Sequence, residues 1–148
     1  MKKVTMLNGP NLNLLGVREP DKYGNCTLDE IVSNCSKLSN KNGFTLKSLQ
    51  SNSETELINW IQLSLDDETE GLIINPGAYG HTSVGLRDAF LAVSLPFVEI
   101  HISNIFSREE FRRRTLLSDI AIGVVSGFGS YSYTLGLQAL FNHLTKAS

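Results

Sequence analysis

The sequence predicts an α/β fold in which helices cover both faces of a five-stranded parallel sheet. Three observations predict it. Short apolar runs alternate with amphipathic segments. S/T-x-x-E boxes mark where two helices begin, and a proline marks where another ends. No repeat or Pro/Gly/Ser-rich linker divides the chain. With 148 residues, 41% of them apolar, the chain is long enough for one buried core, and we expect a single domain over residues 1–148.

The first half of the chain predicts two strand and helix units. Residues 4–7 form a short apolar strand, and the T-x-x-E box at residues 27–30 begins a helix that Gly43 ends. Residues 44–49 alternate apolar and polar side chains like an edge strand, and the S-x-x-E box at residues 53–56 begins the second helix. The inward stripes of the two helices are expected to be Leu28, Ile31, Val32, Cys35 and Leu38, then Leu57, Ile61 and Leu65.

The second half repeats the pattern. Residues 71–74 predict a third strand, and residues 81–83 open a third helix that a proline stops before a fourth strand at 97–102. A helical turn near residues 109–114 and a fifth strand at 120–125 precede the last helix. The inward residues of the third and last helices are expected to be Leu86, Phe90 and Val93, then Leu137, Leu140, Phe141 and Leu144.

Right-handed crossovers between such strands give a three-layer, flavodoxin-like sandwich with strand order 2-1-3-4-5. In this architecture ligands bind at the carboxyl ends of the strands. The unusual polar residues follow strands one, three and four, where a binding crevice is expected. They are Asn8, Asn11, Asn75, Glu99, His101 and Ser103.

Charge and composition favour a small-molecule ligand. A formal net charge of −2 gives no reason to expect nucleic acid or an anionic membrane as partner. The basic start is followed by too few apolar residues for a signal peptide, and no apolar run approaches a membrane span. Cys26 and Cys35 lack metal-ligand spacing and are interpreted as free thiols in a reducing cytoplasm.

The fourth strand carries the clearest chemical pattern. Its period of two places Glu99, His101 and Ser103 on one face, although a central parallel strand is normally apolar on both faces. An ionised Glu99 there needs a partner, and pairing with His101 would favour the imidazolium and supply an acid at neutral pH. A core ion pair without a catalytic role is the alternative, but the position at the crevice favours catalysis.

The connection over residues 8–24 is longer than most strand-to-helix loops and is interpreted as a lid. It carries Arg18 and Tyr23. A guanidinium about 4 Å from a phenolate contributes up to about 4 kcal/mol at an effective dielectric constant of about 20, which could make the tyrosine a base. The alternative is an arginine stacked on an exposed tyrosine.

Two further segments are candidates for ligand binding. In residues 75–83 two glycines allow close backbone approach, Asn75 could orient a hydroxyl group, and His81 is either a ligand contact or a capping residue. Thr82 and Ser83 are interpreted as helix caps. The cluster Arg108, Arg112, Arg113 and Arg114 could supply one or two anion contacts, with the rest solvated.

Together these segments resemble the type II 3-dehydroquinate dehydratases. The resemblance spans most of the chain and lies in four motifs in the right order, namely residues 8–24, 75–88, 99–104 and 108–112. The departures are Gly80, where a threonine is common, and Arg113-Arg114, where histidines are frequent. The resemblance implies a hydro-lyase of the shikimate pathway that serves aromatic amino acid biosynthesis and assembles as a homododecamer built from trimers.

The resemblance also implies residue roles. Tyr23, ionised with help from Arg18, removes a proton beside the substrate ketone. His101, held by Glu99, protonates the leaving hydroxyl of the enolate, giving 3-dehydroshikimate by anti elimination. Asn11 holds a water near the enolate oxygen. The substrate-binding residues implied are the backbone at Ile102 and Ser103 for the carboxylate, Asn75, His81 and Arg112 for the hydroxyls, and Asp88 from a neighbouring subunit.

No cofactor or metal is expected. Past Lys3 no lysine lies on predicted strands one, three, four or five, so a Schiff-base route has no obvious amine. Two alternatives remain open. A flavodoxin-like binding or signalling module would need an acidic cluster or a phosphate loop after strand one, which is missing. A metal-dependent hydrolase could use His81, His101 and Glu99 as ligands.

Overall fold

The computed structural model describes residues 1–17 and 26–146. Its parallel sheet has the order β2-β1-β3-β4-β5, as predicted. The strands are β1 (Lys2–Asn8), β2 (Phe44–Gln50), β3 (Thr69–Asn75), β4 (Phe97–His101) and β5 (Gly123–Ser126). Register aligns Asn8 of β1 with Asn75 of β3, and Ile74 of β3 with Glu99 of β4. The polar residues therefore meet at one edge of the sheet, at the carboxyl ends of its central strands.

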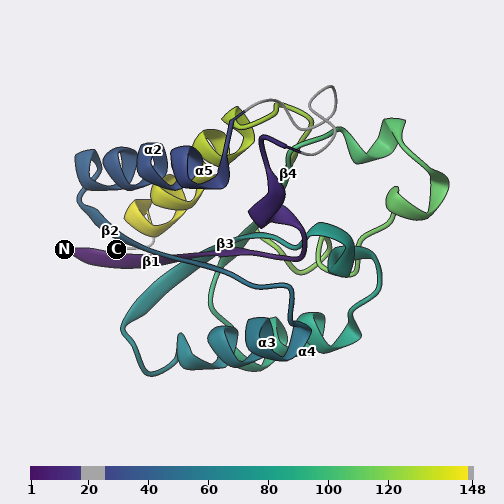
Figure 1. Cartoon of the computed structure of the whole chain (residues 1–148). Helices are drawn as coiled ribbons and strands as arrows, with labels where there is room; N and C mark the ends of the chain where they lie inside the picture. Colours follow the sequence, from purple (N-terminus) through teal and green to yellow (C-terminus); the bar gives the residue numbers. More distant parts are fainter. Residues whose placement is uncertain (18–25, 147–148) are drawn as a thin grey trace.

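Helices cover both faces of the sheet (Figure 1). One layer contains α2 (Leu28–Lys41) and α5 (Tyr131–Lys146), and the other contains α3 (Glu54–Leu63) and α4 (Val84–Val93). The sheet separates two apolar clusters. One joins α2 and α5 to residues such as Val98 and Ile100, and the other joins α3 and α4 to residues such as Leu72 and Ile74. The predicted three-layer α/β architecture is confirmed.

Predicted capping residues begin three of the helices. The side chains of Thr27, Ser53 and Ser83 accept hydrogen bonds from the backbone N–H three residues later, at 3.2, 3.2 and 2.9 Å. Each bond satisfies one of the N–H groups that the first turn of a helix leaves without a partner. The start of α4 fixes the end of the 75–83 segment, which also contains the 3₁₀ turn η2 (Gly77–His81).

Three predicted boundaries need correction. The second helix ends at Leu63, so Leu65 is not on its inward stripe and is 60% exposed. The Ser64 hydroxyl and N–H both bond the Ile61 carbonyl, which tightens the last turn and ends the helix. Leu65 then continues in that turn, donating its N–H to the Gln62 carbonyl.

The other two corrections concern strands. The fourth strand ends at His101 rather than at residue 102, and the fifth begins at Gly123 rather than at residue 120. The N–H groups of Ile120 and Ala121 both donate to the Leu117 carbonyl, so these apolar residues belong to a turn and not to the sheet ladder. The helical turn expected near residues 109–114 is present as a shorter 3₁₀ turn, η4 (Glu110–Arg112).

Both cysteines are unpaired, and Cys35 is buried on α2, as predicted. In the described part of the chain, no helix combines the length and apolar character that crossing a bilayer requires.

Candidate active site

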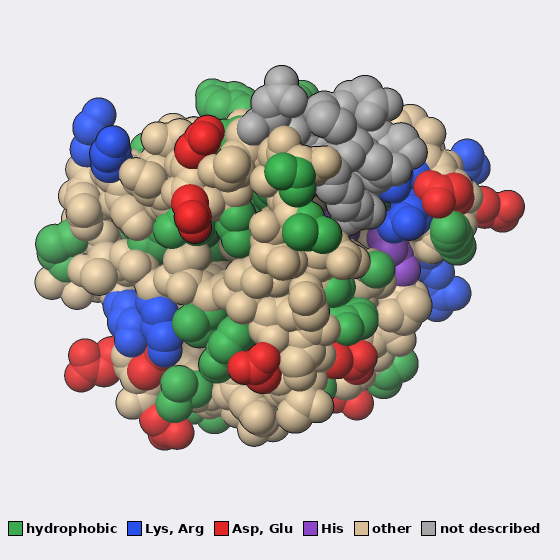
Figure 2. All heavy atoms as spheres, in the orientation of Figure 1, with side chains coloured by type: hydrophobic (Ala, Val, Ile, Leu, Met, Phe, Trp, Pro, Cys, Tyr) green, Lys and Arg blue, Asp and Glu red, His purple; other side chains and the backbone are tan. Residues whose placement is uncertain are grey.

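A pocket lies at the carboxyl ends of the central strands, where the sequence predicts a crevice. Its walls come from the turn after β1, from the end of β3 with η2, from the end of β4, and from the segment that follows β4. In Figure 2, histidine side chains are visible between lysine and arginine side chains at one end of the molecule. The described residues that line the pocket are Pro10, Asn11, Leu12, Asn75, Gly77, Ala78, His81, His101, Ile105, Arg108 and Arg112.

A buried carboxylate and imidazole pair forms the floor beside β4. His101 Nε2 lies 2.5 Å from Glu99 Oε2, and the two residues are 4% and 0% exposed. Because a carboxylate only accepts hydrogen bonds, Nε2 is the donor, and the other ring nitrogen, Nδ1, is left for the pocket. The pair predicted from the strand period is therefore present, with the geometry of an oriented proton donor.

Two hydroxyl groups complete the surroundings of Glu99. The Ser118 and Thr115 hydroxyls lie 2.7 and 3.1 Å from Glu99 Oε1. The carboxylate thus has hydrogen-bond donors at both oxygens, which offsets the cost of burying its charge. Both hydroxyls belong to the irregular segment between η4 and β5.

His81 approaches the same pocket from η2. Its Nδ1 lies 2.8 Å from the Arg114 carbonyl oxygen, so Nδ1 carries the proton and Nε2 is an acceptor when the ring is neutral. Burial is the main cause that lowers the pKa of His81, and His101 and Arg112 lower it further. The rings of His81 and His101 are 6.0 Å apart between centroids. A neutral His81 can accept a hydrogen bond from a ligand hydroxyl.

A second buried network lies below Asn75. The Tyr133 hydroxyl donates to Asn8 Oδ1 at 2.6 Å and accepts from Asn75 Nδ2 at 3.0 Å, while Asn75 Oδ1 accepts from the Gly77 N–H at 3.2 Å. Burial raises the pKa of Tyr133, so its hydroxyl stays neutral. The network fixes the orientation of the Asn75 amide and leaves its second N–H as a donor for the pocket.

The remaining polar wall contains Asn11 and two arginines. Asn11 has a φ of 69°, a left-handed conformation that asparagine tolerates well, and its N–H donates to Asn52 Oδ1 at 2.9 Å. Arg108 donates to the Ser103 hydroxyl at 3.2 Å, and Arg112 bonds Glu109 at 3.1 Å. The wall therefore combines hydrogen-bonding groups with positive charge, which suits an anionic, polyhydroxylated molecule.

The described residues show no group of three or more His, Cys, Asp or Glu side chains that could hold a metal ion. Each histidine of the pocket uses one ring nitrogen in a hydrogen bond, His101 Nε2 to Glu99 and His81 Nδ1 to a backbone carbonyl oxygen.

Comparison with known proteins shows the family of this chain. The family model described as "Dehydroquinase class II" matches residues 2–141. The chain belongs to this family. It is 53% identical over 146 residues to the 3-dehydroquinate dehydratase of Teredinibacter turnerae, covering 99% of this chain and 95% of that protein. It is 52% identical over 141 residues to the enzyme of the same name from Vesicomyosocius okutanii, covering 95% of each.

Solved structures of the family share the fold. The type II dehydroquinase from Butyrivibrio crossotus matches with a TM-score of 0.92 at 37% identity, over 95% of this chain and 97% of that one. The type II dehydroquinase from Propionibacterium acnes gives 0.91 at 37% identity, over 96% and 97%.

The structure places the predicted site residues of this family member in three groups. Asn11, Asn75, His81, His101 and Arg112 line the pocket. Glu99 lies behind His101, and Ser103 lies next to Arg108.

The third group, Asp88 and Ile102, is absent from the pocket lining. Asp88 is exposed on α4 and is not among the residues that line the pocket. Ile102 is buried with its side chain in the α2 and α5 cluster, so only its backbone could serve a ligand. Arg18 and Tyr23, the predicted base and its activator, lie outside the residues that the structure describes.

Three contributors were not singled out from the sequence as site residues, namely Tyr133, Thr115 and Ser118. A signal existed for one of them, Tyr133. Tyr133 lies on the same buried stripe as Leu137, Leu140 and Leu144, and a buried phenol needs a partner. The hydroxyl pair Thr115 and Ser118 is spaced like a helix cap, so its sequence does not distinguish a cap from a contact to a distant carboxylate.

The departures from the family pattern fit the local packing. A Cβ atom at Gly80 would lie 2.7 Å from Pro76 Cγ, so a threonine at this position would displace the Pro76 ring. Arg113 and Arg114 are exposed, and Arg114 contributes to the site through its backbone carbonyl, which any residue can supply.

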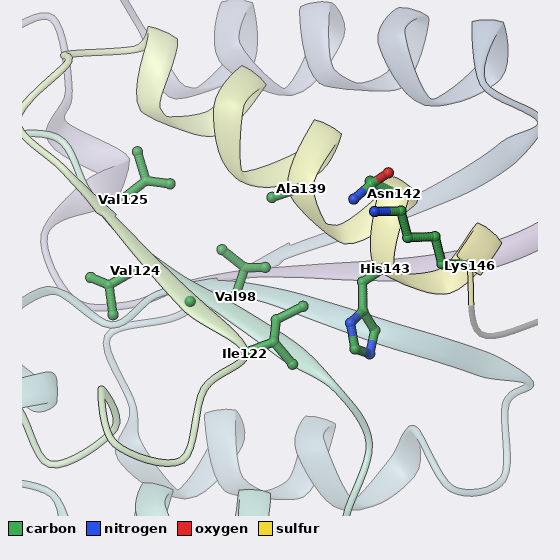
Figure 3. Close-up of a pocket in the computed structure, with 9 residues that line it drawn as sticks. Val98, Ile122, Val124, Val125, Ala139, Asn142, His143 and Lys146 are labelled. Carbon is green, nitrogen blue, oxygen red and sulfur yellow. The ribbon is translucent and has the colours of Figure 1, made fainter.

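A larger pocket lies elsewhere, between β5 and the carboxyl-terminal half of α5 (Figure 3). Val98, Ile122 and Val124 form its strand side, and Asn142, His143 and Lys146 form its helix side. It contains neither Glu99 nor His101 and lies away from the carboxyl ends of β1 and β3. The chemistry is therefore assigned to the smaller polar pocket.

Proposed function

We propose that this chain catalyses the dehydration of 3-dehydroquinate to 3-dehydroshikimate, the hydro-lyase step of the shikimate pathway that leads to aromatic amino acids. Membership of the class II dehydroquinase family supports the proposal, as do the names of relatives that are about half identical over nearly the whole chain. We further propose that residues 1–148 act as one catalytic domain.

The single observation that carries the proposal is the buried Glu99 and His101 pair opening onto a polar pocket. Elimination of water needs an acid for the departing hydroxyl and a base for the carbon-bound proton. A carboxylate 2.5 Å from one ring nitrogen fixes the direction of the imidazole, so the other nitrogen is aimed to donate a proton when the ring carries two.

In the proposed first step, Tyr23 as phenolate takes the proton from the carbon beside the substrate ketone. The electron pair of the broken C–H bond moves toward the ketone and forms an enolate. Arg18 favours the phenolate electrostatically, and Asn11 holds a water at the enolate oxygen. Tyr23 and Arg18 receive these roles from the resemblance to the family, and Asn11 is supported by its position in the pocket wall.

In the second step the enolate re-forms the ketone and expels the ring hydroxyl, while His101 gives that oxygen a proton, so that water leaves. Base and acid act on opposite faces of the ring, which makes the elimination anti. Tyr23 then returns its proton to solvent, and His101 regains one, so the enzyme ends as it began. No external oxidant or reductant is consumed.

Substrate binding follows from the pocket wall. We propose that the backbone at Ile102 and Ser103 takes the substrate carboxylate and that Asn75, His81 and Arg112 hold its hydroxyl groups. The Asn75 amide presents an N–H donor, whereas neutral His81 presents an acceptor nitrogen. Asn75 can therefore bind a hydroxyl oxygen of the substrate, and His81 can accept a hydroxyl proton.

Assembly and location complete the proposal. We propose a homododecamer built from trimers, with the exposed Asp88 contacting substrate in a neighbouring subunit, and a cytoplasmic enzyme. Sedimentation of the purified protein tests the assembly. If it sediments as a monomer with full activity, the roles of the dodecamer and of Asp88 are wrong.

The decisive experiment adds 3-dehydroquinate to the purified protein and follows conjugated-enone absorbance. Wild type should generate the enone, and Tyr23→Phe should lose nearly all turnover while ligand affinity stays close to wild type. An inactive wild type contradicts the proposed function, and near-normal turnover in Tyr23→Phe contradicts the proposed base.

Two treatments separate this mechanism from its alternatives. Borohydride with substrate should leave the enzyme active, because no Schiff base is formed. Exhaustive chelation should leave turnover unchanged, whereas activity lost to a chelator and restored by added metal would favour the metal-dependent hydrolase.

A further inference from the structure

Residues 113–119, which we call the 113–119 segment, form an irregular stretch that contacts one pocket histidine, His81, and the carboxylate partner of the other. The Arg114 carbonyl bonds His81 at 2.8 Å, and the Leu116 N–H bonds the Gly80 carbonyl at 2.8 Å. Farther along, Thr115 and Ser118 reach Glu99, the partner of His101. One short segment thus joins the two elements that carry the pocket histidines.

The segment is anchored independently of the pocket. Leu117 is 0% exposed and packs in the cluster between the sheet and the α3 and α4 layer. Arg87 of α4 donates to the Leu116 carbonyl at 2.9 Å and binds both carboxylate oxygens of Asp119. An apolar anchor and a bidentate arginine therefore hold the hydroxyl-bearing residues in place.

Counting protons identifies the hydroxyl on which Glu99 depends. Thr115 Oγ and Ser118 Oγ contact each other as well as Glu99, but each hydroxyl has only one proton. Two chains each satisfy two of the three contacts, and the one in which Thr115 donates to Ser118 and Ser118 donates to Glu99 Oε1 uses the shorter contact to the carboxylate. It agrees with the distances, since Ser118 is the closer of the two to Glu99 at 2.7 Å.

The direction of this chain matters for His101. Glu99 is 0% exposed, so bulk water cannot replace a lost donor. With Oε1 fixed by Ser118, Oε2 is directed at His101 Nε2, and the opposite ring nitrogen is directed at the pocket. Without the hydroxyls the carboxylate can rotate, and the proton donor loses its orientation.

We propose that Ser118, aligned by Thr115, is a positioning residue that acts through Glu99 to aim His101 at the leaving hydroxyl. The inference rests on the proposed dehydratase function and deepens it. Neither residue lines the pocket. Their effect should therefore appear in the chemical step and not in substrate affinity.

The test compares Ser118→Ala, Thr115→Val and the double variant with wild type. In Ser118→Ala the Thr115 hydroxyl can still donate at its longer distance, so the double variant should show the largest loss. General-acid catalysis contributes roughly 10²- to 10⁴-fold, so a misaimed acid should cost the double variant about tenfold in kcat, with KM nearly unchanged. Ser118→Thr keeps a hydroxyl and should retain most of the activity.

Proton NMR separates an effect on the hydrogen bond between Glu99 and His101 from a general loss of stability. A short imidazole to carboxylate hydrogen bond gives a strongly downfield N–H signal, which Glu99→Gln should abolish and so assign to His101. In the double variant this signal should shift or broaden. Ser39→Ala is the matched control, because it removes a buried hydroxyl that bonds the Cys35 carbonyl on α2, far from the pocket.

The outcomes are distinguishable. If kcat and the downfield signal both stay at wild-type values in the double variant, or if only thermal stability falls, the inference is overturned. Should the double variant fail to fold, the two single variants are judged by the same criteria. A wild type that does not convert 3-dehydroquinate contradicts the proposed function instead, and the NMR result still decides whether Ser118 orients the pair.

Discussion

Two buried polar networks lie at the carboxyl ends of neighbouring strands, and they differ in charge. The network at β4 contains the Glu99 and His101 pair with two hydroxyl donors. The network at β1 and β3 contains only neutral groups, the Tyr133 hydroxyl between the amides of Asn8 and Asn75. The first can exchange a proton, whereas the second can only fix the direction of a donor.

The two networks divide proton transfer from substrate recognition within one fold. Proton transfer requires a group that holds charge, and holding charge in the core requires several donors. Orientation requires only that both sides of an amide have distinct partners, which the Tyr133 hydroxyl and the Gly77 N–H supply. We therefore expect damage to the charged network to reduce kcat and damage to the neutral network to raise KM.

The largest effect is expected for Glu99→Gln. The amide keeps the shape of the side chain but cannot stabilise an imidazolium, so general-acid catalysis by His101 should be lost. Steady-state assays should show kcat lower by roughly 10²- to 10⁴-fold. Should kcat stay within about threefold of wild type, the charged network is not the acid.

Tyr133→Phe probes the neutral network. Removing the hydroxyl leaves Asn8 Oδ1 and Asn75 Nδ2 without this partner in a site that is 0–3% exposed, which should cost about 1–3 kcal/mol of unfolding free energy. The free rotation of Asn75 should raise KM several-fold while kcat changes less. Urea unfolding and steady-state kinetics measure the two effects.

The control for this variant is Tyr131→Phe, on the same helix but 57% exposed. It should change neither stability nor KM measurably. A loss in kcat alone for Tyr133→Phe would mean that the neutral network takes part in the chemical step. It would contradict the expectation that this network affects only KM.

A smaller effect concerns the pH dependence of stability at His81. Its pKa in the folded chain lies below 6.5, mainly because of burial, so the unfolded chain binds the proton more readily. Stability should therefore be fully present above that value and should fall as the pH drops toward the folded pKa. His81→Asn, which keeps an N–H donor near the Arg114 carbonyl, should show a shallower fall in urea unfolding between about pH 7.5 and pH 5. An identical slope in both proteins would contradict the assignment.

The smallest effect is expected at Cys35, which lies among the apolar residues behind Tyr133. Burial raises the pKa of this thiol to about 12, so it stays neutral and adds no charge to the neutral network. Because the thiolate is the reactive form, a thiol reagent should modify Cys35 only after unfolding, while the partly exposed Cys26 reacts earlier. Rapid labelling of Cys35 in the native protein, detected by mass spectrometry, would contradict this environment.

Much of the fold could be predicted because its signals are local. Cap boxes gave the starts of α2 and α3, and the period of two gave the face shared by Glu99 and His101. The predictions for Leu65 as a helix residue and for residues 120–122 as strand residues were wrong, because apolar residues also occur in turns. Backbone hydrogen bonds to the carbonyls of Ile61, Gln62 and Leu117 form these turns.

The supporting residues of the site could not be predicted for a related reason. Tyr133 is 58 residues from Asn75 and 125 from Asn8, and Ser118 is 19 residues from Glu99. Such pairs are formed by the packing of helices and loops onto the sheet, which no sequence period specifies. The predicted roles of Tyr23, Arg18 and Asp88 stay predictions.

The variant His101→Gln separates the two halves of the elimination, proton removal and loss of the hydroxyl. In deuterated water, NMR of recovered 3-dehydroquinate follows proton exchange beside the ketone, and absorbance follows enone formation. Exchange should continue, because the base is intact, while enone formation should fall by roughly 10²-fold or more. Enone formation at the wild-type rate would contradict the assignment of His101 as the acid.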